Sequence, residues 1–327
     1  MKSTAIANSN IALIKYWGKA NEELFLPMNS SISMTLDNLQ TICTVEFSED
    51  FEKDIVEINN QPANPKTAGR IVKHLDLVRR IGKTDLKAKV ATNFNFPIGA
   101  GLASSASASA SLTLAGCSAL GMDFDKRQLS ILARQGSGSS CRSIYGGYVK
   151  WLKSDTSEGS YAVQIADENH FDIRDVIAVV SKEEKAVSSR DGMKTTVETS
   201  PLYKVRLQEV EVSLSYMEKA ILDKDFEAIG RLAEADCLSM HATMLTSQPS
   251  LLYWEPITVK LMKSVQRWRD DGISAYFTID AGPNVHILTL PEYAKEVEAR
   301  LKEMPEVLEV IHSKPGSDAM ITNKHLY

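Results

Sequence analysis

A turn rich in glycine and serine is the stretch of this sequence whose residue types are best suited to hold a phosphate. It spans residues 95–107, contains two glycines and a proline, and places the hydroxyls of Ser104 and Ser105 side by side. Small residues with helical character continue to about Gly116, so the turn is predicted to lead into a helix. At such a junction the backbone N–H groups and the positive end of the helix can face an anion. The alternative is a capped helix of small residues that packs closely on a sheet.

Two other segments combine cations with hydroxyl groups. Lys-Tyr-Trp-Gly-Lys runs from Lys15 to Lys19, after an apolar stretch that indicates a strand. Two lysines and a tyrosine hydroxyl around a glycine can coordinate a phosphate, although an ordinary strand end with solvated lysines has the same composition. The segment Gly136–Ser143 contains two glycines, several hydroxyls and Arg142, and it follows Arg134. Arginine offers a planar fork to phosphate oxygens, so this segment is either an anion site or a polar connection.

Several residues with reactive side chains have structural roles in our interpretation. Asp280 stands in Asp-Ala-Gly-Pro-Asn, which by itself is the sequence of a turn. Asp125 and Gln128 are spaced as a capping box that opens a helix, so Asp125 is not a predicted metal ligand. Cys141 has no histidine near it in the sequence and is predicted to be a buried thiol. His241 lies on a helical stretch between methionines, where we expect a packing residue.

The order of residues in the glycine-serine turn favours phosphate binding. Pro-x-x-x-Gly-Leu-x-Ser-Ser-Ala begins at Pro97 and resembles the phosphate loop of the GHMP kinase superfamily, whereas no Walker A sequence is present. The resemblance implies that the chain binds ATP. The loop residues implied to contact the nucleotide are Pro97, Gly99, Ala100, Gly101, Leu102, Ala103, Ser104, Ser105 and Ser107.

Further segments narrow the resemblance to one branch of that superfamily. Ile-Lys-Tyr-Trp-Gly-Lys, Gly-Ser-Gly-Ser-Ser-Cys-Arg-Ser, Ser-Ser-Arg at Ser188 and Asp-Ala-Gly-Pro-Asn at Asp280 together resemble the diphosphomevalonate decarboxylase family. Their order runs from near one end of the chain to near the other. The resemblance implies ATP-dependent decarboxylation of (R)-5-diphosphomevalonate to isopentenyl diphosphate. Mg²⁺ is expected to bridge phosphate oxygens, with protein ligands that the sequence does not assign.

The resemblance also implies roles for the polar residues of these segments. Asp280 would orient the 3-hydroxyl of the substrate or accept its proton while that hydroxyl attacks the γ-phosphate. A carboxylate that works beside other anions needs cations around it, and Lys19, Arg142 and Arg190 are the implied counter-charges. The residues implied in catalysis are Asp280, Arg142, Lys19 and Asn10. Those implied to hold the diphosphate and carboxylate of the substrate are Tyr16, Lys19, Ser137, Ser139, Arg142, Ser189 and Arg190.

Three other activities stay open at this point. A related decarboxylase could use 5-phosphomevalonate, because one phosphate could occupy part of the same set of cations. A kinase could stop at a 3-phosphorylated product, although Asp280 and Lys19 argue against that class. A binding or regulatory protein of the same fold would have little reason to hold all the charged positions together.

Bulk properties exclude several classes of partner. The chain has 327 residues, 43% hydrophobic and 24% charged, which is the composition of a soluble globular protein. A net charge of -5 gives no general attraction to nucleic acid or an anionic membrane, so an anionic ligand needs a local basic cluster. We expect neither a signal peptide nor a membrane span, since the most apolar run, residues 103–122, is diluted with serine. Four scattered cysteines predict reduced thiols and a cytoplasmic enzyme, and the family resemblance implies a homodimer.

The hydrophobic pattern predicts an α+β protein that positions these segments. Expected strands lie at residues 5–17, 31–36, 42–47, 55–58, 86–94, 145–152, 161–166, 176–181, 273–279, 285–290 and 307–312, and expected helices at 67–81, from the turn to about 116, from 125, between 200 and 271, and at 293–304. The resemblance implies the GHMP kinase fold, with a ribosomal-protein-S5-like lobe (residues 1–185) and a ferredoxin-like α/β lobe (residues 186–327). The lobes are expected to be intimately joined, with the active site in the cleft between them.

Overall fold

Two long antiparallel strands, β1 (Lys2–Ile14) and β4 (Ser31–Ser48), are the basis of the first lobe. The computed structural model describes residues 1–98, 101–183 and 185–327. The sequence predicted two strands in place of β4, because polar residues separate its apolar halves. In the structure the register shifts between Asn8 and Asn10 of β1, so a bulge in β4 absorbs the extra residues and the strand continues.

The remaining strands of this sheet flank the long pair. They are β5 (Ile55–Ile58), β6 (Gln61–Pro62), β7 (Lys87–Phe94), β8 (Tyr148–Trp151), β9 (Ala162–Ala166) and β14 (Met320–Thr322). The main order is β14-β1-β4-β7-β5-β6, and β8 pairs with the other half of β4. The strands expected at residues 145–152 and 161–166 are confirmed as β8 and β9, which pair as an antiparallel hairpin. A separate pair, β2 (Lys19–Asn21) with β3 (Leu26–Pro27), follows β1 and was not predicted.

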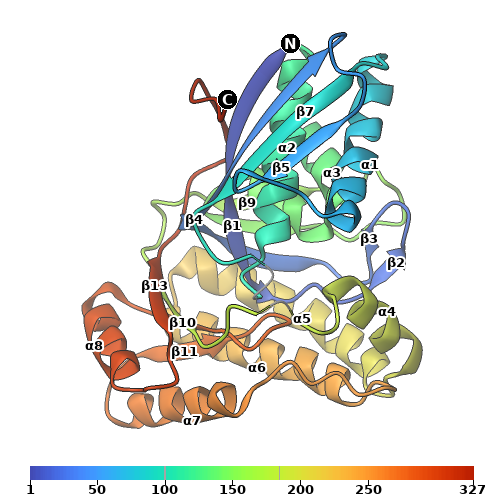
Figure 1. The fold of residues 1–327 in the computed structure, drawn as a ribbon. Coiled ribbons are helices and arrows are strands. Elements are labelled where there is room, and N and C mark those ends of the chain that lie inside the picture. Colours follow the sequence, from blue (N-terminus) through green and yellow to red (C-terminus); the bar gives the residue numbers. More distant parts are fainter. Residues whose placement is uncertain (99–100, 184) are drawn as a thin grey trace.

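Helices α1 (Pro65–Gly82), α2 (Ser104–Ala119) and α3 (Lys126–Gly136) cover one face of this sheet (Figure 1). The alanines and serines of α2 leave little bulk, so this helix packs against both β1 and β4. The predicted capping box opens α3, because the carboxylate of Asp125 accepts from the backbone N–H of Gln128 at 2.7 Å. A 3-10 turn, residues 138–144, follows α3 and contains much of the second predicted anion segment.

The second lobe contains a four-stranded antiparallel sheet and the remaining helices. Its strands are β10 (Arg174–Val179), β11 (Ala275–Thr278), β12 (Val285–Thr289) and β13 (Glu309–Ser313), and its helices are α4 (Ser189–Thr199), α5 (Tyr203–Asp223), α6 (Phe226–Leu245), α7 (Pro256–Asp270) and α8 (Pro291–Lys302). The strand order β11-β12-β10-β13, with helices after β10 and after β12, is the split βαβ pattern of a ferredoxin-like sheet. The implied architecture of this lobe is confirmed. Within the described ranges, no helix combines the length and apolar character needed to cross a membrane.

The two lobes share strands and a core. β10 precedes the predicted boundary at residue 185 yet pairs in the second sheet, while β14, near the end of the chain, pairs with β1. The largest apolar cluster contains Ile11 and Met34 from the first sheet, Ile177 and Leu288 from the second, and residues of α5 and α6. The lobes are therefore intimately joined, as predicted. The division at residues 185 and 186 stays a prediction.

Cys141 and His241 have the structural roles predicted for them. Burial raises the pKa of the Cys141 thiol to about 12, and its Sγ donates to the carbonyl of Gly138 at 3.1 Å. All four cysteines are buried and free of disulfides. The ring of His241 packs against Trp254, with 4.6 Å between the ring centroids. Neither residue is placed to act as a nucleophile or a metal ligand.

A glycine on α6 tests how the second lobe packs. A Cβ at Gly230 would collide with the ring of Tyr276 on β11, whereas a Cβ at Gly69 on α1 would meet nothing within 4 Å. We predict that Gly230→Ala lowers the free energy of unfolding by about 1–3 kcal/mol, although alanine is the better helix former. The control, Gly69→Ala, should raise it by roughly 0.5–1 kcal/mol. Urea unfolding measures both, and equal effects of the two substitutions would contradict this packing.

Candidate active site

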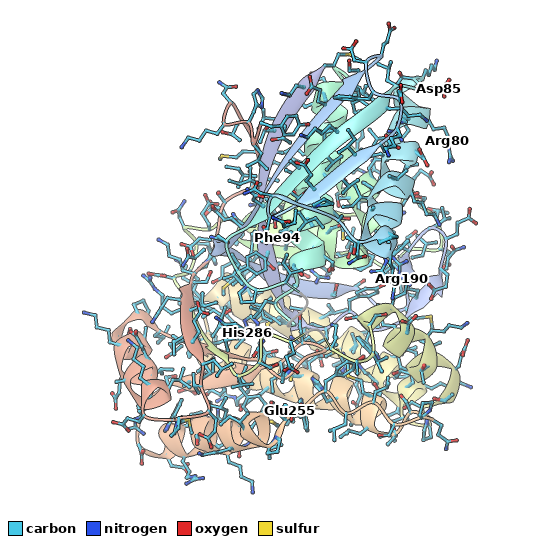
Figure 2. All side chains as sticks on the ribbon, viewed as in Figure 1. Arg80, Asp85, Phe94, Arg190, Glu255 and His286 are labelled. Atoms are coloured by element: carbon cyan, nitrogen blue, oxygen red, sulfur yellow. The ribbon has the colours of Figure 1, made fainter. Side chains whose placement is uncertain are left out.

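A cavity of about 430 Å³ lies where the two lobes meet. Its walls include the end of β1, the start of α2, the 3-10 turn after α3, the start of α4 and the loop after β11. Figure 2 shows Arg190, at the start of α4, at the boundary between the lobes. The predicted site residues that line the cavity are Tyr16, Lys19, Gly101, Ala103, Ser104, Ser105, Ser137, Ser139, Arg142, Ser189, Arg190 and Asp280. Segments far apart in the sequence therefore meet at one place.

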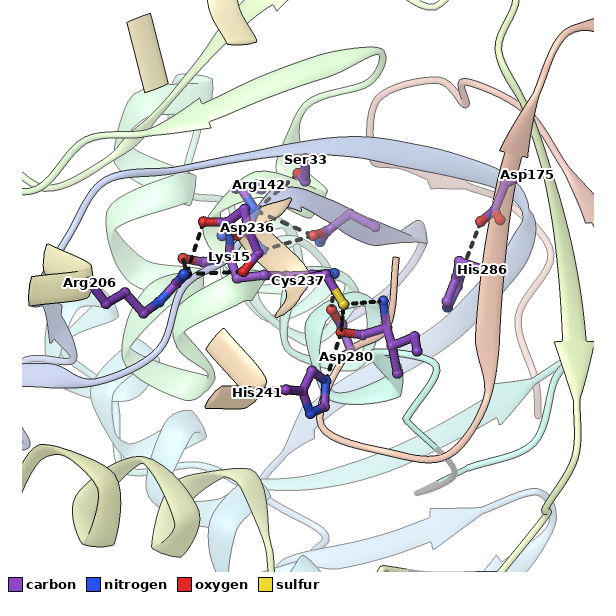
Figure 3. Close-up of polar contacts among 12 residues, drawn as sticks. Lys15, Ser33, Arg142, Asp175, Arg206, Asp236, Cys237, His241, Asp280 and His286 are labelled. Carbon is purple, nitrogen blue, oxygen red and sulfur yellow. Dashed lines mark hydrogen bonds and ion pairs between the residues drawn. The ribbon is translucent and has the colours of Figure 1, made fainter. Parts of the chain in front are cut away.

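An ion pair crosses from one lobe to the other inside this cavity (Figure 3). Lys15 Nζ, just beyond β1, lies 2.7 Å from Oδ1 of Asp280, in the loop after β11. The lysine side chain is 2% exposed and the aspartate side chain 25%, so the carboxylate keeps some of its surface open to the cavity. Burial by itself would raise the pKa of Asp280, but Lys15, His286 and Arg142 together hold that pKa below its usual value. The carboxylate is therefore charged at neutral pH.

Arg142 is a buried cation whose hydrogen-bond partners are neutral. Its Nη1 donates to Ser31 Oγ at 2.6 Å, its Nε to Ser33 Oγ at 2.9 Å, and its Nη2 to Asn10 Oδ1 at 3.1 Å. Within the described part of the chain, no carboxylate forms an ion pair with this guanidinium. Burial also lowers the pKa of Arg142. Burying an unpaired ion costs on the order of several kcal/mol of desolvation free energy. An anionic ligand would offset this cost, so the arrangement favours one.

Asn10 holds Arg142 and does not itself line the cavity. Its side-chain oxygen accepts from Arg142, and its Nδ2 donates to Ser143 Oγ at 2.8 Å and to the carbonyl of Ser139 at 3.3 Å. The family resemblance implied that Asn10 helps to fix a substrate carboxylate. In the structure its polar groups orient the guanidinium, and a role toward the substrate carboxylate stays a prediction.

A second group of cations lies near the start of α4. Lys19 Nζ and Arg190 Cζ stand 4.8 Å and 4.9 Å from the ring centroid of the same residue, Phe25. Burial lowers the pKa of Lys19; Glu22 opposes that shift and Arg190 adds to it. Lys19 forms its ion pair with Glu22, and the cation in direct contact with Asp280 is Lys15, which was not among the implied counter-charges. Arg142, which was among them, also helps to lower the pKa of Asp280. Two cations gathered around one ring favour binding of a multiply charged anion.

The hydroxyl of Tyr16 is also placed for a ligand. It is buried, lines the cavity and has no hydrogen-bond partner among the described residues. Burial raises the pKa of Tyr16, so the phenol stays protonated and can donate. A buried donor without a partner is costly, and a phosphate or carboxylate oxygen would satisfy it.

The phosphate turn presents a helix start to the cavity. The residue before α2 is Ala103, whose left-handed backbone has φ 50° and whose methyl group cannot cap the helix. Ser105 Oγ lies 3.2 Å from Ser137 Oγ, so this turn touches the segment after α3. The positive end of α2 thus meets the cavity next to hydroxyl groups, which suits a phosphate.

Other residues of the turn have different positions. Ser107 Oγ is buried and lies 2.7 Å from Thr41 Oγ1, so the hydroxyl faces the sheet and not the cavity. Leu102 belongs to the shared apolar core, and Pro97 is not part of the cavity wall. Gly99 and Ala100 lie outside the described residues. Among the described residues, the predicted nucleotide contacts that line the cavity are Gly101, Ala103, Ser104 and Ser105, and the roles of the whole set stay a prediction.

The cavity continues from this turn into the first lobe. Apolar and polar side chains alternate there, and they are Ile58, Thr67, Arg70, Ile71, His74, Phe94 and Leu112. Mixed walls of this kind are typical of sites for small organic ligands and cofactors. The extension is therefore suited to the nucleoside part of ATP.

The donor set near the turn suits Mg²⁺ held mainly by phosphates. Among the residues that the structure describes, no three His, Cys, Asp or Glu side chains are grouped to hold a metal ion. Mg²⁺ usually keeps several waters and binds one or two protein oxygens together with substrate phosphates. Ser104 and Ser105 are the hydroxyls that would serve such an ion.

The contacts of two lysines in the site were not predicted from the motifs. Lys15 belonged to a predicted phosphate segment, but its pairing with Asp280 was not predicted. A lysine at the end of a buried strand is a signal that could have indicated an acidic partner. Lys185 lies in no motif. Its Nζ donates to Ser189 Oγ and to the carbonyl of Ala281, both at 2.8 Å, and so connects α4 with the loop of Asp280.

Comparison with known proteins identifies the family. The sequence profile of the diphosphomevalonate decarboxylase-like N-terminal domain matches residues 7–162, and that of the mevalonate 5-diphosphate decarboxylase C-terminal domain matches residues 175–322. The diphosphomevalonate decarboxylase of Bos taurus is 38% identical over 320 residues, which cover 91% of this chain and 79% of the relative. The chain belongs to the diphosphomevalonate decarboxylase family.

Solved structures of this family have the same fold. The mevalonate diphosphate decarboxylase from Enterococcus faecalis, described in terms of ATP binding mediated by mevalonate diphosphate, is 40% identical with a TM-score of 0.91. A structure of MDDEF in complex with MVAPP, AMPPCP and magnesium is 41% identical with a TM-score of 0.93. Each comparison covers 99% of both chains. The GHMP kinase fold implied by the sequence is confirmed along the chain.

Inorganic pyrophosphate tests the cation cluster of this decarboxylase-family site without requiring turnover. We predict that Arg190→Ala weakens pyrophosphate binding about tenfold or more, because a hydrogen bond to a charged group contributes roughly 1.5–3 kcal/mol. The control is Arg231→Ala, which removes an exposed arginine of α6 that pairs with Glu227. Its affinity should stay within about twofold of the original. Calorimetric titration compares the two, and equal losses would remove Arg190 from the anion site.

Proposed function

We propose that the chain catalyses the ATP-dependent decarboxylation of (R)-5-diphosphomevalonate to isopentenyl diphosphate, with release of ADP, phosphate and CO₂. The observation that carries this proposal is one cavity in which Asp280, paired with Lys15, stands near Arg142 and the start of α2. Family membership supports the reaction class. The related MDDEF structure contains MVAPP, AMPPCP and magnesium, which supports the choice of substrate, nucleotide and metal.

The charges of the substrate match the charges of the cavity. A diphosphate group needs several cations, and Lys19, Arg190 and the hydroxyl of Tyr16 are available on one side. A carboxylate needs a single fork, which the guanidinium of Arg142 can provide. The substrate then lies with its 3-hydroxyl near Asp280 and with ATP approaching from the start of α2.

Asp280 acts mainly by orienting the hydroxyl that attacks ATP. Because Lys15 helps to keep the pKa of Asp280 low, its carboxylate is a weak base. Enzymatic phosphoryl transfer depends chiefly on positioning and on electrostatic stabilisation, so a weak base is sufficient. Asp280 accepts a hydrogen bond from the 3-hydroxyl and takes its proton as the new O–P bond forms and the bond to ADP breaks.

Phosphorylation then makes the tertiary oxygen able to leave. The C–O bond breaks with its electron pair on phosphate, and the electron pair of the bond to the carboxylate forms the new double bond as CO₂ departs. During this step the carboxylate loses its charge. Arg142 stays in place because Ser31, Ser33 and Asn10 hold its guanidinium independently of the substrate.

The nucleotide site supplies the remaining parts. The start of α2 and the hydroxyls of Ser104 and Ser105 face the phosphates, and the extension lined by Ile58 and Leu112 receives the nucleoside. When bound, Mg²⁺ neutralises phosphate oxygens and favours departure of ADP. Lys185 lines the same cavity and contacts both α4 and the Asp280 loop.

A product assay tests the proposed substrate. The protein is given ATP and Mg²⁺ with mevalonate, its 5-phosphate or its 5-diphosphate, while ADP, CO₂ and the isoprenoid product are measured separately. We expect all three products with the diphosphate, because it brings the most negative charge to Lys19 and Arg190. Release of CO₂ with the monophosphate instead would establish the related decarboxylase, and ADP without CO₂ would establish a 3-kinase. No turnover with any of them would leave only a binding protein.

Replacing the central acid tests its role. We predict that Asp280→Asn lowers kcat at least about a hundredfold while the Kd for ATP changes little, because orientation of the hydroxyl is lost in the reacting complex. Asp271→Asn, which alters an exposed carboxylate at the end of α7, is the matched control. Rapid-quench measurement of turnover and equilibrium nucleotide binding separate the two effects. Near-normal turnover of Asp280→Asn would exclude it from the mechanism.

Location and assembly are part of the same proposal. Four buried, unpaired cysteines support a reducing compartment, and we assign the enzyme to the cytoplasm. Support for a homodimer comes from the family resemblance and from α5, which exposes Val205, Val212 and Tyr216 along one side. Light scattering of the purified protein measures its mass, and the mass of a single chain would remove the dimer from the proposal.

A further inference from the structure

One helix holds the backbone on both sides of the central ion pair. Lys15 lies beyond β1 in the first lobe, and Asp280 follows β11 in the second. Between them runs α6, whose residues Asp236, Cys237 and His241 contact the chain at or next to each member of the pair (Figure 3). None of these three side chains lines the cavity, so none is placed to touch a substrate.

Asp236 fixes the lysine side of the pair. Its Oδ2 accepts from the backbone N–H of Lys15 at 2.6 Å, and its Oδ1 accepts from Arg206 Nη2 at 3.0 Å. Arg206 also reaches the carbonyl of Lys15 at 3.4 Å. The side chains of Arg206 and Asp236 are 2% and 3% exposed, so a buried ion pair holds the backbone N–H and C=O groups of Lys15.

Cys237 and His241 fix the aspartate side. Ile279 precedes Asp280, and its backbone N–H donates to Cys237 Sγ at 3.2 Å. Its carbonyl lies 3.3 Å from His241 Nε2. A carbonyl can only accept, so Nε2 of His241 carries the proton, and burial lowers the pKa of this ring to about 4 and keeps it neutral. Helix α6 thus also holds the backbone of Ile279, the residue before Asp280.

We propose that Asp236 is a positioning residue, which with Arg206 holds Lys15 at the distance from Asp280 that the reaction requires. This inference rests on the proposed function. A buried ion pair gives little net stability compared with apolar side chains of the same size, so stability alone does not explain its presence. The pair does orient the backbone of Lys15. One carboxylate oxygen of Asp236 accepts from the N–H of Lys15, and the other accepts from Arg206, which also reaches the carbonyl of Lys15.

Asparagine at this position provides the sharpest substitution. Its shape is nearly that of aspartate, but one of its two polar ends is an NH₂ group. Both existing partners, the N–H of Lys15 and the guanidinium of Arg206, are donors. Whichever way the amide turns, one donor faces another, so the peptide of Lys15 loses its fixed place.

The expected readout is the pH dependence of turnover. The groups that face Asp280 are Lys15 from the end of β1, Arg142 from the 3-10 turn, His286 from β12, paired with Asp175 on β10, and His241 and Cys237 from α6. When Lys15 is displaced, Asp280 loses its closest cation and its pKa rises. The acid limb of the profile of kcat/KM must therefore move to higher pH.

The test compares Asp236→Asn with a change on the same helix. We expect Asp236→Asn to lower kcat at least about tenfold, to leave the KM for ATP within about twofold, and to move the acid limb up by about one pH unit. The control is Glu234→Gln, which breaks the buried pair with Arg269 and alters none of the contacts that α6 makes with Lys15 and Ile279. It should lower the Tm comparably and leave the acid limb in place. An unmoved limb in Asp236→Asn, or the same shift in the control, overturns the proposal.

A double substitution separates positioning from general damage. If Asp236 acts through Lys15, then Asp236→Asn costs little further kcat/KM in a Lys15→Met background, whereas independent losses multiply. If Asp236→Asn does not fold, Arg206→Lys replaces it, because lysine keeps the charge but loses the fork that reaches Lys15, and a smaller shift of the same limb is expected. An inactive wild type would count against the proposed function. An active wild type with multiplying losses would count against this inference alone.

Discussion

A lysine from one lobe and an aspartate from the other must stay in contact inside a cavity that binds anions, and the architecture serves that requirement. Lys15 and Asp280 stand 2.7 Å apart at the ends of strands that belong to different sheets. Their attraction weakens quickly with distance and with entry of water. A core shared by both sheets, α5 and α6 keeps the two strand ends from drifting apart, because packed interiors deform little. The junction of the lobes is thus itself a part of the site.

The protein concentrates positive charge locally while its net charge is -5. Arg142, which lines the cavity, contributes to this because its hydrogen-bond partners are neutral. Arg142 rests on two serines and an asparagine. Such partners fix direction without neutralising charge, so attraction remains for a ligand. Lys15 and Lys19 differ from Arg142, because they pair with the carboxylates of Asp280 and Glu22.

Local patterns predicted the parts of the molecule that local interactions decide. The capping box at Asp125 and the strand of residues 55–58 follow from a few neighbouring side chains, and both were predicted with their bounds nearly correct. The partner of Asp280 was out of reach, because 265 positions separate it from Lys15 and only the tertiary fold brings them together. The continuity of β4 was also hidden, since a bulge depends on the partner strand as much as on the strand that contains it. Motifs identified residues of the pocket, whereas the hydrogen bonds and ion pairs among them depend on the tertiary fold.

During synthesis, β1 is complete long before its neighbour β14 is made. The strand β1 is made more than three hundred residues before its neighbour at residues 320–322. Throughout that interval the edge of β1 at Thr4–Ile6 exposes unpaired N–H and C=O groups, which are a template for pairing with other chains. Until residues 320–322 join the sheet, this edge of β1 is therefore open to pairing between chains.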